Sequence, residues 1–552
     1  MSDEKPFVNL KAFLSKADVN YVHLEHFLSS SDVVGFELTG EIQGKLFVKR
    51  AEDKEPKWVS FINTGIEGIL SLTNRSSSAV LLIKTDDRVI AYTFGYGRFM
   101  LDHSLFVQDF GIKTALNTLM PHSLRSVELF TVDRSAIQKK TQAVRDSSVD
   151  DFGIDVSKDI LRAVTGAPNR DTDFLSVSGG DSVYSFSKLA DFSDLPDISQ
   201  SLIDYYNKDL YKANFSWVDN IRRLKNDTKR SKLENRLREQ VESKDATNLA
   251  ITAPEVISWD KVIGFSFTHS RNTIYPTLDI NDYFNCLDSD RLTLSALKSH
   301  KLYVHQDNTS EVHYSLYKSF YFEVVDGNST YILFSGDWFE VDNDYIGLLN
   351  QQLSFIGISS LNFPTVHIWS HDGKDKIESE GAYNERAALL RSYHLLDKKT
   401  IKSRTTTSPI ELCDLLTDQK QFIHVKHKKG GSSGLSHLFA QGYVAAEVVL
   451  SDREFRKKAR RKLQNIRHGL NNLIPLDRIN SHEYEVVYLI LGEDNSTVKS
   501  SLPFFSKINL VKAYENLTQK GFKVTICGVG KEEIEPPQEI KELPSENTEL
   551  ET

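Results

Sequence analysis

Short apolar runs alternate with polar positions in the first part of the chain, as they do in β-strands. Such runs occur at residues 46–49, 79–83 and 89–93, and an amphipathic stretch over 105–119 predicts a helix. Polar residues then lead to a predicted helix start at 155–161. We therefore expect an N-terminal α+β domain over residues 1–165.

The middle region, residues 166–370, changes from a helical to a strand pattern. Eight Lys and Arg residues lie between positions 222 and 238, within a helical stretch over 198–242. This charge run is either a solvated helix face, which Glu234 and Glu239 would balance, or a phosphate-contacting helix. Aromatic-rich runs separated by polar turns over 251–370 predict a mostly β region.

The last globular segment, residues 371–530, has a helix–strand–strand–helix pattern. Residues 531–552 contain eight Glu and two Lys and no aromatic residue, which predicts a disordered acidic tail. The expected fold class is therefore a multidomain α+β protein with a C-terminal α/β unit.

Composition limits the possible partners. The chain has 552 residues with 67 Lys+Arg and 76 Asp+Glu, a net charge of −9, so a nucleic-acid surface must be a local patch. Three cysteines without paired spacing exclude a disulfide framework and a cysteine-rich zinc site. No apolar run approaches the roughly 20 residues that span a bilayer, and the first residues do not resemble a secretory signal. We expect a cytoplasmic protein with no membrane partner.

A hairpin in the last segment carries the candidate chemistry. A helix over 382–390 precedes two strands, 410–416 and 421–428, which a polar turn joins. Strand alternation places Ile423 and Val425 on one face, and His424, Lys426 and Lys428 on the other. We expect the first face to pack and the second to be open.

Phosphodiester hydrolysis needs a divalent cation held by carboxylates, an activated water and positive charge near the phosphate. Asp414 and Lys426 meet these needs from adjacent strands, and Glu385 or Glu380 of the preceding helix would complete the metal shell. These features resemble the PD-(D/E)xK restriction-endonuclease-like nucleases over about 60 residues. The resemblance implies a restriction-endonuclease-like C-terminal core that cleaves DNA or RNA with Mg or Mn.

Two positions depart from that pattern. His424 stands where the superfamily usually has Glu, Asp or Gln, and Cys413 where it usually has Pro. As a metal ligand, His424 would favour Mn, Fe or Zn over Mg, because imidazole is softer than carboxylate. Alternatively, Lys426 and Lys428 are solvent-facing residues of an edge strand and Asp414 is a polar residue at a strand end.

Residues after the hairpin predict a nucleic-acid surface. Ser433 is a candidate N-cap in a glycine-rich loop whose helix start would receive a phosphate. The resemblance implies that a polar residue of the next helix, Gln441 or His437, faces the active site. A basic helix over 453–468 is either a phosphate-contacting surface or a solvated amphipathic helix. The candidate nucleic-acid contacts are Lys428, Ser433 and six residues of this helix, namely Arg456, Lys457, Lys458, Arg460, Arg461 and Lys462.

Two glycine-containing stretches, 94–98 and 178–182, are weaker candidates for phosphate loops. Each lacks the full spacing of a nucleotide-binding motif, and a tight turn explains each better. A nucleotide-using enzyme therefore remains a rival interpretation.

Over residues 7–527 the chain resembles a sporadically distributed bacterial family of uncharacterised function, often met on mobile or defence-associated loci. The matching stretches include Tyr92–Arg98, Asp159–Gly166, Ile423–Lys426 and Leu435–Gly442. We expect a metal-dependent nuclease of bacterial defence, acting as a homo-oligomer or with proteins of the same locus, whose first 370 residues recognise or regulate. The alternative is a non-catalytic nucleic-acid-binding or sensor protein.

Overall fold

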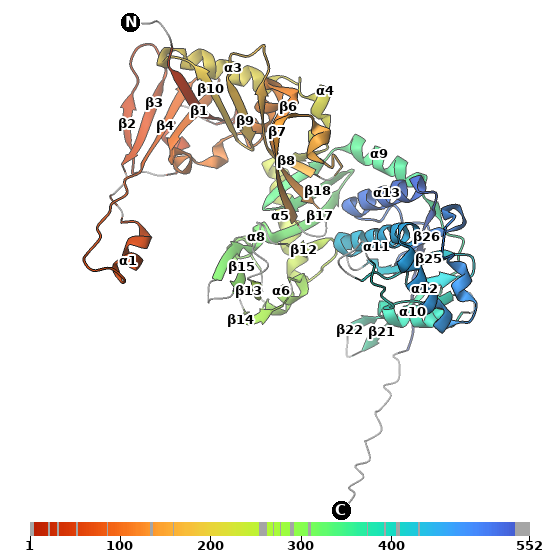
Figure 1. Ribbon diagram of the computed structural model, residues 1–552. Helices are drawn as coiled ribbons and strands as arrows, with labels where there is room; N and C mark the ends of the chain where they lie inside the picture. The colour runs from red at the N-terminus through yellow and green to blue at the C-terminus, as the bar shows by residue number, and fades with distance from the viewer. Residues whose placement is uncertain are drawn as a thin grey trace, which may run out of the picture.

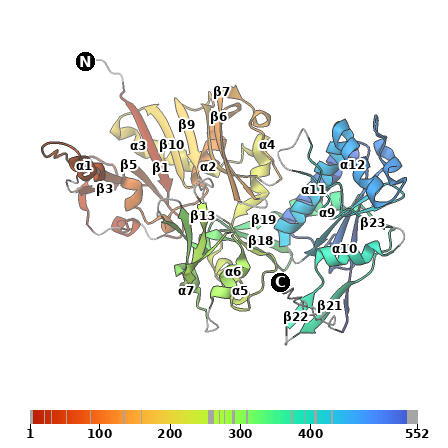
Figure 2. The same cartoon turned by 60° about the horizontal axis from the view of Figure 1, so that its bottom comes forward.

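The computed structural model shows a mixed α+β protein built from three units that follow one another along the chain (Figures 1 and 2). The description covers residues 5–19, 22–29, 32–50, 53, 55–85, 87–132, 136–157, 159–252, 262–268, 270–276, 278–287, 292–306, 311–371, 374–390, 393–403, 409–428 and 431–535.

The first unit is a ten-stranded antiparallel sheet of order β2-β3-β4-β5-β1-β10-β9-β8-β6-β7. Helices α2 (Phe110–Thr118) and α3 (Leu195–Asn207) share a hydrophobic core with it. Its strands are β1 (Phe7–Leu14), β2 (Val34–Glu37), β3 (Gly44–Arg50), β4 (Ser77–Lys84), β5 (Val89–Gly95), β6 (Leu119–Val132), β7 (Ala136–Ser147), β8 (Asp159–Pro168), β9 (Ser176–Gly180) and β10 (Val183–Leu189). A short helix, α1 (Lys57–Asn63), projects beyond β2 and β3 (Figure 1).

The predicted helix start at 155–161 is wrong, because Asp159–Pro168 forms strand β8. Its residues alternate between more and less buried positions, and it pairs with both β6 and β9. The predicted helix over 105–119 corresponds to α2. Because β8 ends at Pro168 and β9 and β10 follow it in the same sheet, the first unit continues past the domain boundary expected at residue 165.

Both glycine-containing stretches are turns or tight contacts of this sheet. Strands β9 and β10 form the expected hairpin, and a Cβ on Gly179 would lie 2.1 Å from the Gly111 carbonyl oxygen of α2. Gly95 ends β5 with φ of 56°, and a Cβ there would lie 2.2 Å from the Ser77 carbonyl oxygen. Close backbone approach therefore accounts for both glycines without a phosphate.

The middle unit contains a five-stranded sheet, β11-β19-β18-β17-β12, and a four-stranded sheet, β14-β13-β15-β16. Their bounds are β11 (Ile221–Arg223), β12 (Leu249–Ile251), β13 (Val262–Phe267), β14 (Ser270–Tyr275), β15 (Lys301–Gln306), β16 (Glu311–Ser315), β17 (Phe320–Asp326), β18 (Ser329–Phe334) and β19 (Asp337–Val341). The helices are α5 (Asp227–Glu242), α6 (Ile280–Cys286), α7 (Leu294–Ser299) and α8 (Leu316–Ser319), whereas the short α4 (Lys212–Phe215) packs in the core of the first unit.

The basic helix α5 of this unit is held by ion pairs within the chain. Lys229, Lys232 and Arg236 all pair with Asp326, the latter two at 3.0 and 2.9 Å. Arg238 pairs with Glu242 at 2.6 Å. These contacts favour the solvated-face interpretation of the charge run over a phosphate-contacting one.

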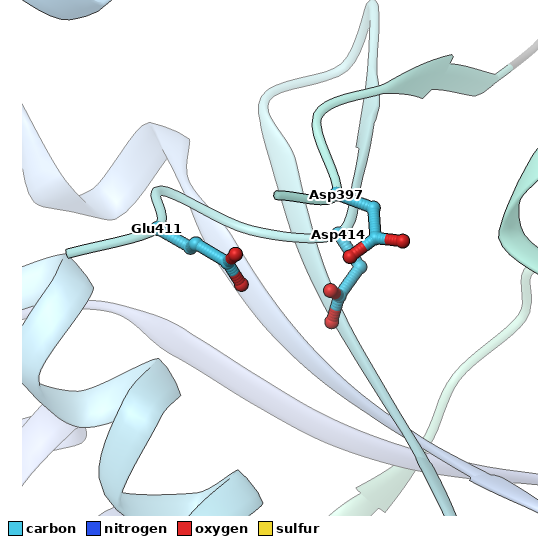
Figure 3. A group of neighbouring side chains, drawn as sticks. All are labelled: Asp397, Glu411 and Asp414. Carbon is cyan, nitrogen blue, oxygen red and sulfur yellow. The ribbon is translucent and has the colours of Figure 1, made fainter. Parts of the chain in front are cut away.

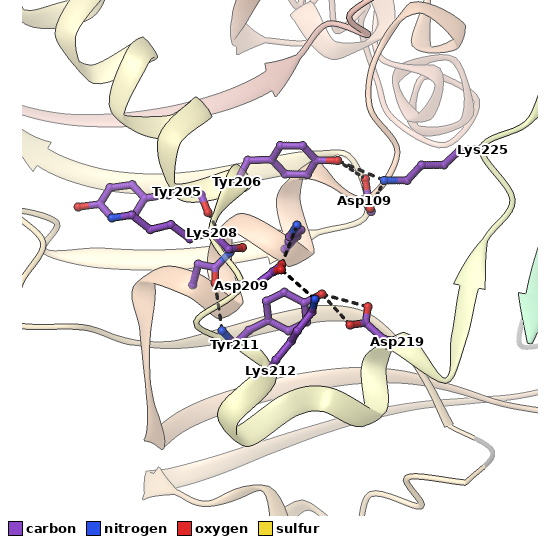
Figure 4. A network of polar contacts seen from close by, with 11 residues as sticks. Asp109, Tyr205, Tyr206, Lys208, Asp209, Tyr211, Lys212, Asp219 and Lys225 are labelled. Carbon is purple, nitrogen blue, oxygen red and sulfur yellow. Dashed lines mark hydrogen bonds and ion pairs between the residues drawn. The ribbon is translucent and has the colours of Figure 1, made fainter. Parts of the chain in front are cut away.

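A cavity of about 780 Å³ lies where the first two units meet. A network of tyrosines, lysines and aspartates borders it (Figure 4), including Lys225–Asp109 at 2.8 Å and Tyr211 Oη to Asp219 at 2.8 Å. Arg222 pairs with Asp342 at 2.7 Å and Arg223 with Asp337 at 2.9 Å. Because the charges around the cavity are paired with one another, they do not select an anionic or a cationic ligand.

The third unit is a six-stranded mixed sheet of order β20-β27-β26-β25-β24-β23. Strands β20, β27, β26 and β25 run parallel, whereas β25, β24 and β23 form an antiparallel meander. The bounds are β20 (Gly357–Ile358), β23 (Tyr393–Leu395), β24 (Leu415–Thr417), β25 (Gln421–His427), β26 (Glu485–Leu491) and β27 (Lys523–Val529). The predicted hairpin is present as β24 and β25.

Helices cover both faces of this sheet (Figure 2). Helix α10 (Glu380–Ala388) packs on the face that contains Ile423 and Val425. The opposite face packs against α11 (Gly431–Ser451) and α13 (Phe504–Gln519), with α12 (Arg453–Ile466) and α9 (Asn343–Ser354) in the same core. A small sheet of β21 (Val366–His371), β22 (Lys374–Ile377) and β28 (Lys531–Glu533) lies beside it.

The third unit extends beyond its expected limits of 371 and 530 at both ends. Strand β20 and helix α9 precede residue 371 and belong to its sheet and core. The first residues of the predicted acidic tail form β28, which pairs with β21, and residues 536–552 lie outside the described part.

A buried glutamate joins the middle unit to the third. Glu323 of β17 accepts hydrogen bonds from the Phe504 backbone N–H at 2.6 Å and from the Tyr321 hydroxyl at 3.0 Å. Phe504 is the first residue of α13, whose N-cap, Pro503, provides no side-chain acceptor. Burial raises the pKa of Glu323 to about 7, although both hydrogen bonds oppose that shift.

Arg456 of α12 is a structural residue, despite its place in the predicted phosphate-contacting surface. Its side chain is 4% exposed, and its guanidinium donates to four backbone carbonyls. The acceptors are the carbonyl groups of Val449, Leu450, Leu476 and Asp477. Arg456 therefore links helix α12 to the end of α11 and to the loop after α12.

We predict that Arg456→Ala lowers the free energy of unfolding by about 2 to 4 kcal/mol, because it removes a buried charge that satisfies four acceptors. Its exposed neighbour is the control, and Lys457→Ala should change the free energy by no more than about 0.5 kcal/mol. Chemical denaturation measures both. Equal effects of the two substitutions would contradict the structural role.

Candidate active site

The site begins where the ladder between β24 and β25 stops. The register pairs Leu415 with Ile423, and the Asp414 backbone N–H donates to the Ile423 carbonyl at 2.9 Å. Beyond this point the Asp414 carboxylate replaces a backbone acceptor and takes the Val425 N–H at 2.7 Å. Asp414 is thereby held with its carboxylate at the end of the ladder between β24 and β25.

Three carboxylates gather at this point (Figure 3). One oxygen each of Asp397, Glu411 and Asp414 lies within 4.8 Å of the others. Asp397 follows β23, and its backbone N–H donates to the Asp414 carbonyl at 3.0 Å. Glu411 follows Ile410, which exchanges two backbone hydrogen bonds with Ile401. Backbone pairing on both sides of Asp414 therefore positions the other two acids.

Lys426 and Glu380 lie next to this cluster. The Lys426 ammonium pairs with one carboxylate oxygen of Glu380 at 2.8 Å, and the His427 backbone N–H donates to the other at 3.1 Å. Glu380 opens α10, where the Ser379 hydroxyl caps the helix by accepting from the Ala382 N–H. A Cβ on the next residue, Gly381, would lie 3.6 Å from an Asp397 carboxylate oxygen. The first turn of α10 thus lies beside Asp397.

Burial and repulsion between carboxylates raise the pKa of two of these acids, Asp414 and Glu411. Burial, together with the charges of Glu411, Asp397 and Glu380, raises the pKa of Asp414 to about 7, although the hydrogen bond from the Val425 N–H opposes the shift. The pKa of Glu411 is also raised, chiefly by burial and then by Asp397. A divalent cation would relieve this repulsion, since it favours the charged form of every carboxylate around it.

The structure brings together three of the residues predicted from the sequence, Asp414, Lys426 and Glu380. Glu385 is exposed on α10 and is not part of the carboxylate cluster. Gln441 is half-buried on α11, and no described contact joins it to the cluster.

The expectation of an open face on β25 is wrong. His424 lies on the face predicted by strand alternation, but α11 covers that face, and the side chain is 3% exposed. Its ring centroid lies 6.3 Å from that of Tyr488, and burial lowers its pKa to about 4. The Nε2 atom has no hydrogen-bond partner among the described residues. His424 does not belong to the cluster, whose possible metal ligands are oxygens only.

Asp397 and Glu411 were missed in the sequence. Glu411 stands three residues before Asp414, so a regular strand over 410–416 would place their side chains on opposite faces. The chain is instead irregular before Leu415, and the two carboxylates meet. The recurrence of acids at 397, 411 and 414 around two short strands is the only sequence signal for the cluster.

The predicted nucleic-acid contacts divide into two groups. Lys428 pairs with Glu493, and Arg460 donates to the Asn471 and Ile474 carbonyls, so these residues stabilise the fold as Arg456 does. Ser433 lies inside the first turn of α11, which begins at Gly431, so the predicted N-cap is wrong. The other predicted contacts of α12 are exposed or half-exposed, namely Lys457, Lys458, Arg461 and Lys462.

The model of a family of unknown function (DUF6119) matches residues 14–530, and the chain belongs to this family. Comparison with curated proteins and with solved structures gives no match. No helix in the described part of the chain combines the length and apolar character that a bilayer crossing requires.

We predict that Mn²⁺ or Mg²⁺ stabilises the protein more at pH 8 than at pH 5.5. The raised pKa of Asp414 makes the folded state bind more protons than the unfolded state between about pH 4 and pH 7, so this group lowers stability as pH rises. Protons also compete with the cation below about pH 7. A cation at 100 times its dissociation constant should add about 2.7 kcal/mol.

Thermal unfolding with and without Mn²⁺ at both pH values measures this effect. Asp414→Asn keeps an acceptor for the Val425 N–H but should abolish the Mn²⁺-induced shift. The exposed Glu385→Gln should retain the shift in full. The same shift in Asp414→Asn and in the unsubstituted protein would rule out metal binding at this cluster.

Proposed function

We propose that this protein is a metal-dependent nuclease that hydrolyses phosphodiester bonds of DNA or RNA, with its catalytic site in a restriction-endonuclease-like third unit. The observation that carries the proposal is the cluster of Asp397, Glu411 and Asp414 beside Lys426. Activity in bacterial defence against foreign nucleic acid, in the cytoplasm, belongs to the same proposal.

The donor set favours a hard cation. Three carboxylates from separate chain segments would hold Mg²⁺ or Mn²⁺, because both prefer oxygen ligands. The bound ion would supply a Lewis acid for the phosphate and an activated water. With His424 outside the cluster, its softer imidazole gives no reason to prefer Fe or Zn.

Lys426 is the residue that we assign to the phosphate. Its ammonium stands next to the acids, held by Glu380, and its charge also acts on Glu411. A fixed positive charge there would stabilise the negative charge that develops on the phosphate in the transition state. Glu380 is then a positioning residue that orients Lys426.

The order of elements supports the same proposal. Helix α10 with Glu380 precedes the meander, Asp414 precedes β24, Lys426 is the last residue but one of β25, and α11 follows. These are the elements and positions on which the resemblance to the nuclease superfamily rests. We further infer that the first two units recognise or regulate, together with a second copy or with proteins from the same locus.

A non-catalytic nucleic-acid-binding or sensor protein is the second candidate. Lys458 and Lys462 on α12 are exposed or half-exposed and make no salt bridge within the described part of the chain, so they would contact phosphates without any cleavage. In that case Lys426 would only hold phosphate.

We predict that the purified full chain cleaves DNA or RNA when Mg²⁺ or Mn²⁺ is present. Asp414→Asn should lower the rate by at least about 10²-fold, because it weakens the metal site, and Lys426→Ala by about 10² to 10³-fold. Glu385→Gln, on the same helix as Glu380 but exposed, should retain the activity. Gel assays with labelled single-stranded and double-stranded substrates measure these rates.

Both inactive variants should still bind nucleic acid, because binding depends mainly on the exposed basic charges. Binding without metal-dependent cleavage of any substrate would support the sensor instead. Cleavage that survives Asp414→Asn would refute this active site.

A further inference from the structure

The chain between Asp397 and Ser403 connects the carboxylate cluster to α12. At one end the Asp397 backbone N–H donates to the Asp414 carbonyl at 3.0 Å. At the other end the Ser403 hydroxyl donates to the Asp452 carboxylate at 2.7 Å, and Asp452 is the N-cap of α12. Ile401 is fixed between these points by its two backbone hydrogen bonds with Ile410. The segment is thus a fixed connection rather than a free loop.

Lysines line this connection. Lys398 and Lys402 are exposed on it, and Lys399 is half-buried. A Cβ on Gly381, in the first turn of α10, would lie 3.3 Å from the Lys398 ammonium, so this lysine stands at the edge of the cluster. The row of lysines therefore begins with Lys398, directly beside the carboxylate cluster.

Two lysines of α12 continue the series. The Lys458 ammonium donates to the Lys402 carbonyl at 2.8 Å. Lys462 lies one turn beyond Lys458 on the same side of α12. Burial and then the charge of Lys462 lower the pKa of Lys399. Within the described residues, Lys399, Lys402, Lys458 and Lys462 make no salt bridge with a carboxylate. The Lys399 ammonium donates to the Leu395 carbonyl at 2.7 Å, so these lysines have backbone acceptors at most and no neutralising carboxylate in the described part.

The other basic residues of α12 point elsewhere. Lys457 and Arg461, one turn apart, line a separate hollow with Asn471 and Leu476. Arg456 and Arg460 are engaged with backbone carbonyls. Helix α12 consequently presents two exposed basic rows, and only the row of Lys458 and Lys462 continues the lysines that lead to the cluster.

We propose that the sugar–phosphate backbone of a nucleic acid binds along Lys398, Lys399, Lys402, Lys458 and Lys462, which we call the lysine track, and so reaches the carboxylate cluster. The proposal rests on the function proposed above, to which it adds the path of the substrate. Phosphates would offset the repulsion among these lysines, whereas the row of Lys457 and Arg461 is not part of the path.

The two rows of α12 provide a matched test. Lys458→Glu/Lys462→Glu and Lys457→Glu/Arg461→Glu each reverse two charges, four residues apart, on the same helix. Both are made in Asp414→Asn and compared with Asp414→Asn alone, in metal-free buffer, with single-stranded and double-stranded DNA and RNA of one sequence. The dissociation constant is measured at several salt concentrations.

We expect the track variant to raise the dissociation constant at least 10-fold and to reduce the slope of log affinity against log salt by about 1.4 to 1.8, the value for two phosphate contacts. The dissociation constant of the control variant should stay within about threefold of that of Asp414→Asn alone. The milder Lys458→Gln/Lys462→Gln, which removes the two charges without reversing them, should also weaken binding more than the control variant does. Thermal unfolding identifies any variant that fails to fold. Comparing the four nucleic acids shows which of them uses the track.

The track would be overturned if both variants lost the same amount of nucleic-acid affinity or if the control variant lost more. It would also be overturned if the parent Asp414→Asn protein bound no nucleic acid. Failure of the nuclease proposal is distinguishable from these results, because binding is measured without metal and without cleavage. A protein that loses binding only in the track variant, yet never cleaves, keeps the track and refutes the nuclease.

Discussion

The hydrogen bond from the Val425 N–H to the Asp414 carboxylate determines the shape of the third unit around its candidate site. A backbone carbonyl in that place would have continued the ladder between β24 and β25, and the acid would have pointed to one face or the other. Because a side chain accepts instead, the chain before Leu415 leaves the sheet. That departure gives Glu411 and Asp397 room to reach the same point.

The rest of the unit makes this departure stable. The sheet beside it is buried on both faces, by α10 on one side and by α11 and α13 on the other, so the ends of its strands are fixed. Charged residues around the site then divide according to their partners. Arg456 and Lys428 stabilise the fold through backbone carbonyls and Glu493, whereas Lys426 is held by Glu380 next to the carboxylate cluster.

The sequence was sufficient for local features and insufficient for long-range ones. Strand alternation and turn residues predicted the β24–β25 hairpin, and the approach of Glu380 to Lys426 followed from the order of helix and strands. Which face would stay open depended on where α11 packs, and the periodicity of β25 contains no information on that. Glu411 and Asp397 were missed because irregular backbone brings them together, and irregular backbone has no period to detect. The strand β8 was mistaken for a helix start because polar residues precede helices and strands alike.

Glu323 has a consequence for how this chain is inherited. It belongs to a strand of the middle unit, yet it accepts the first N–H of α13 in the third unit, whose own N-cap is a proline. A third unit that began at residue 371 would lose that acceptor together with α9, and β27 would become an edge strand without β20. Recombination that exchanged the third unit alone would therefore produce a damaged sheet and an uncapped helix. Descent of the chain as one piece is the expected result, and a family model that matches residues 14–530 agrees with it.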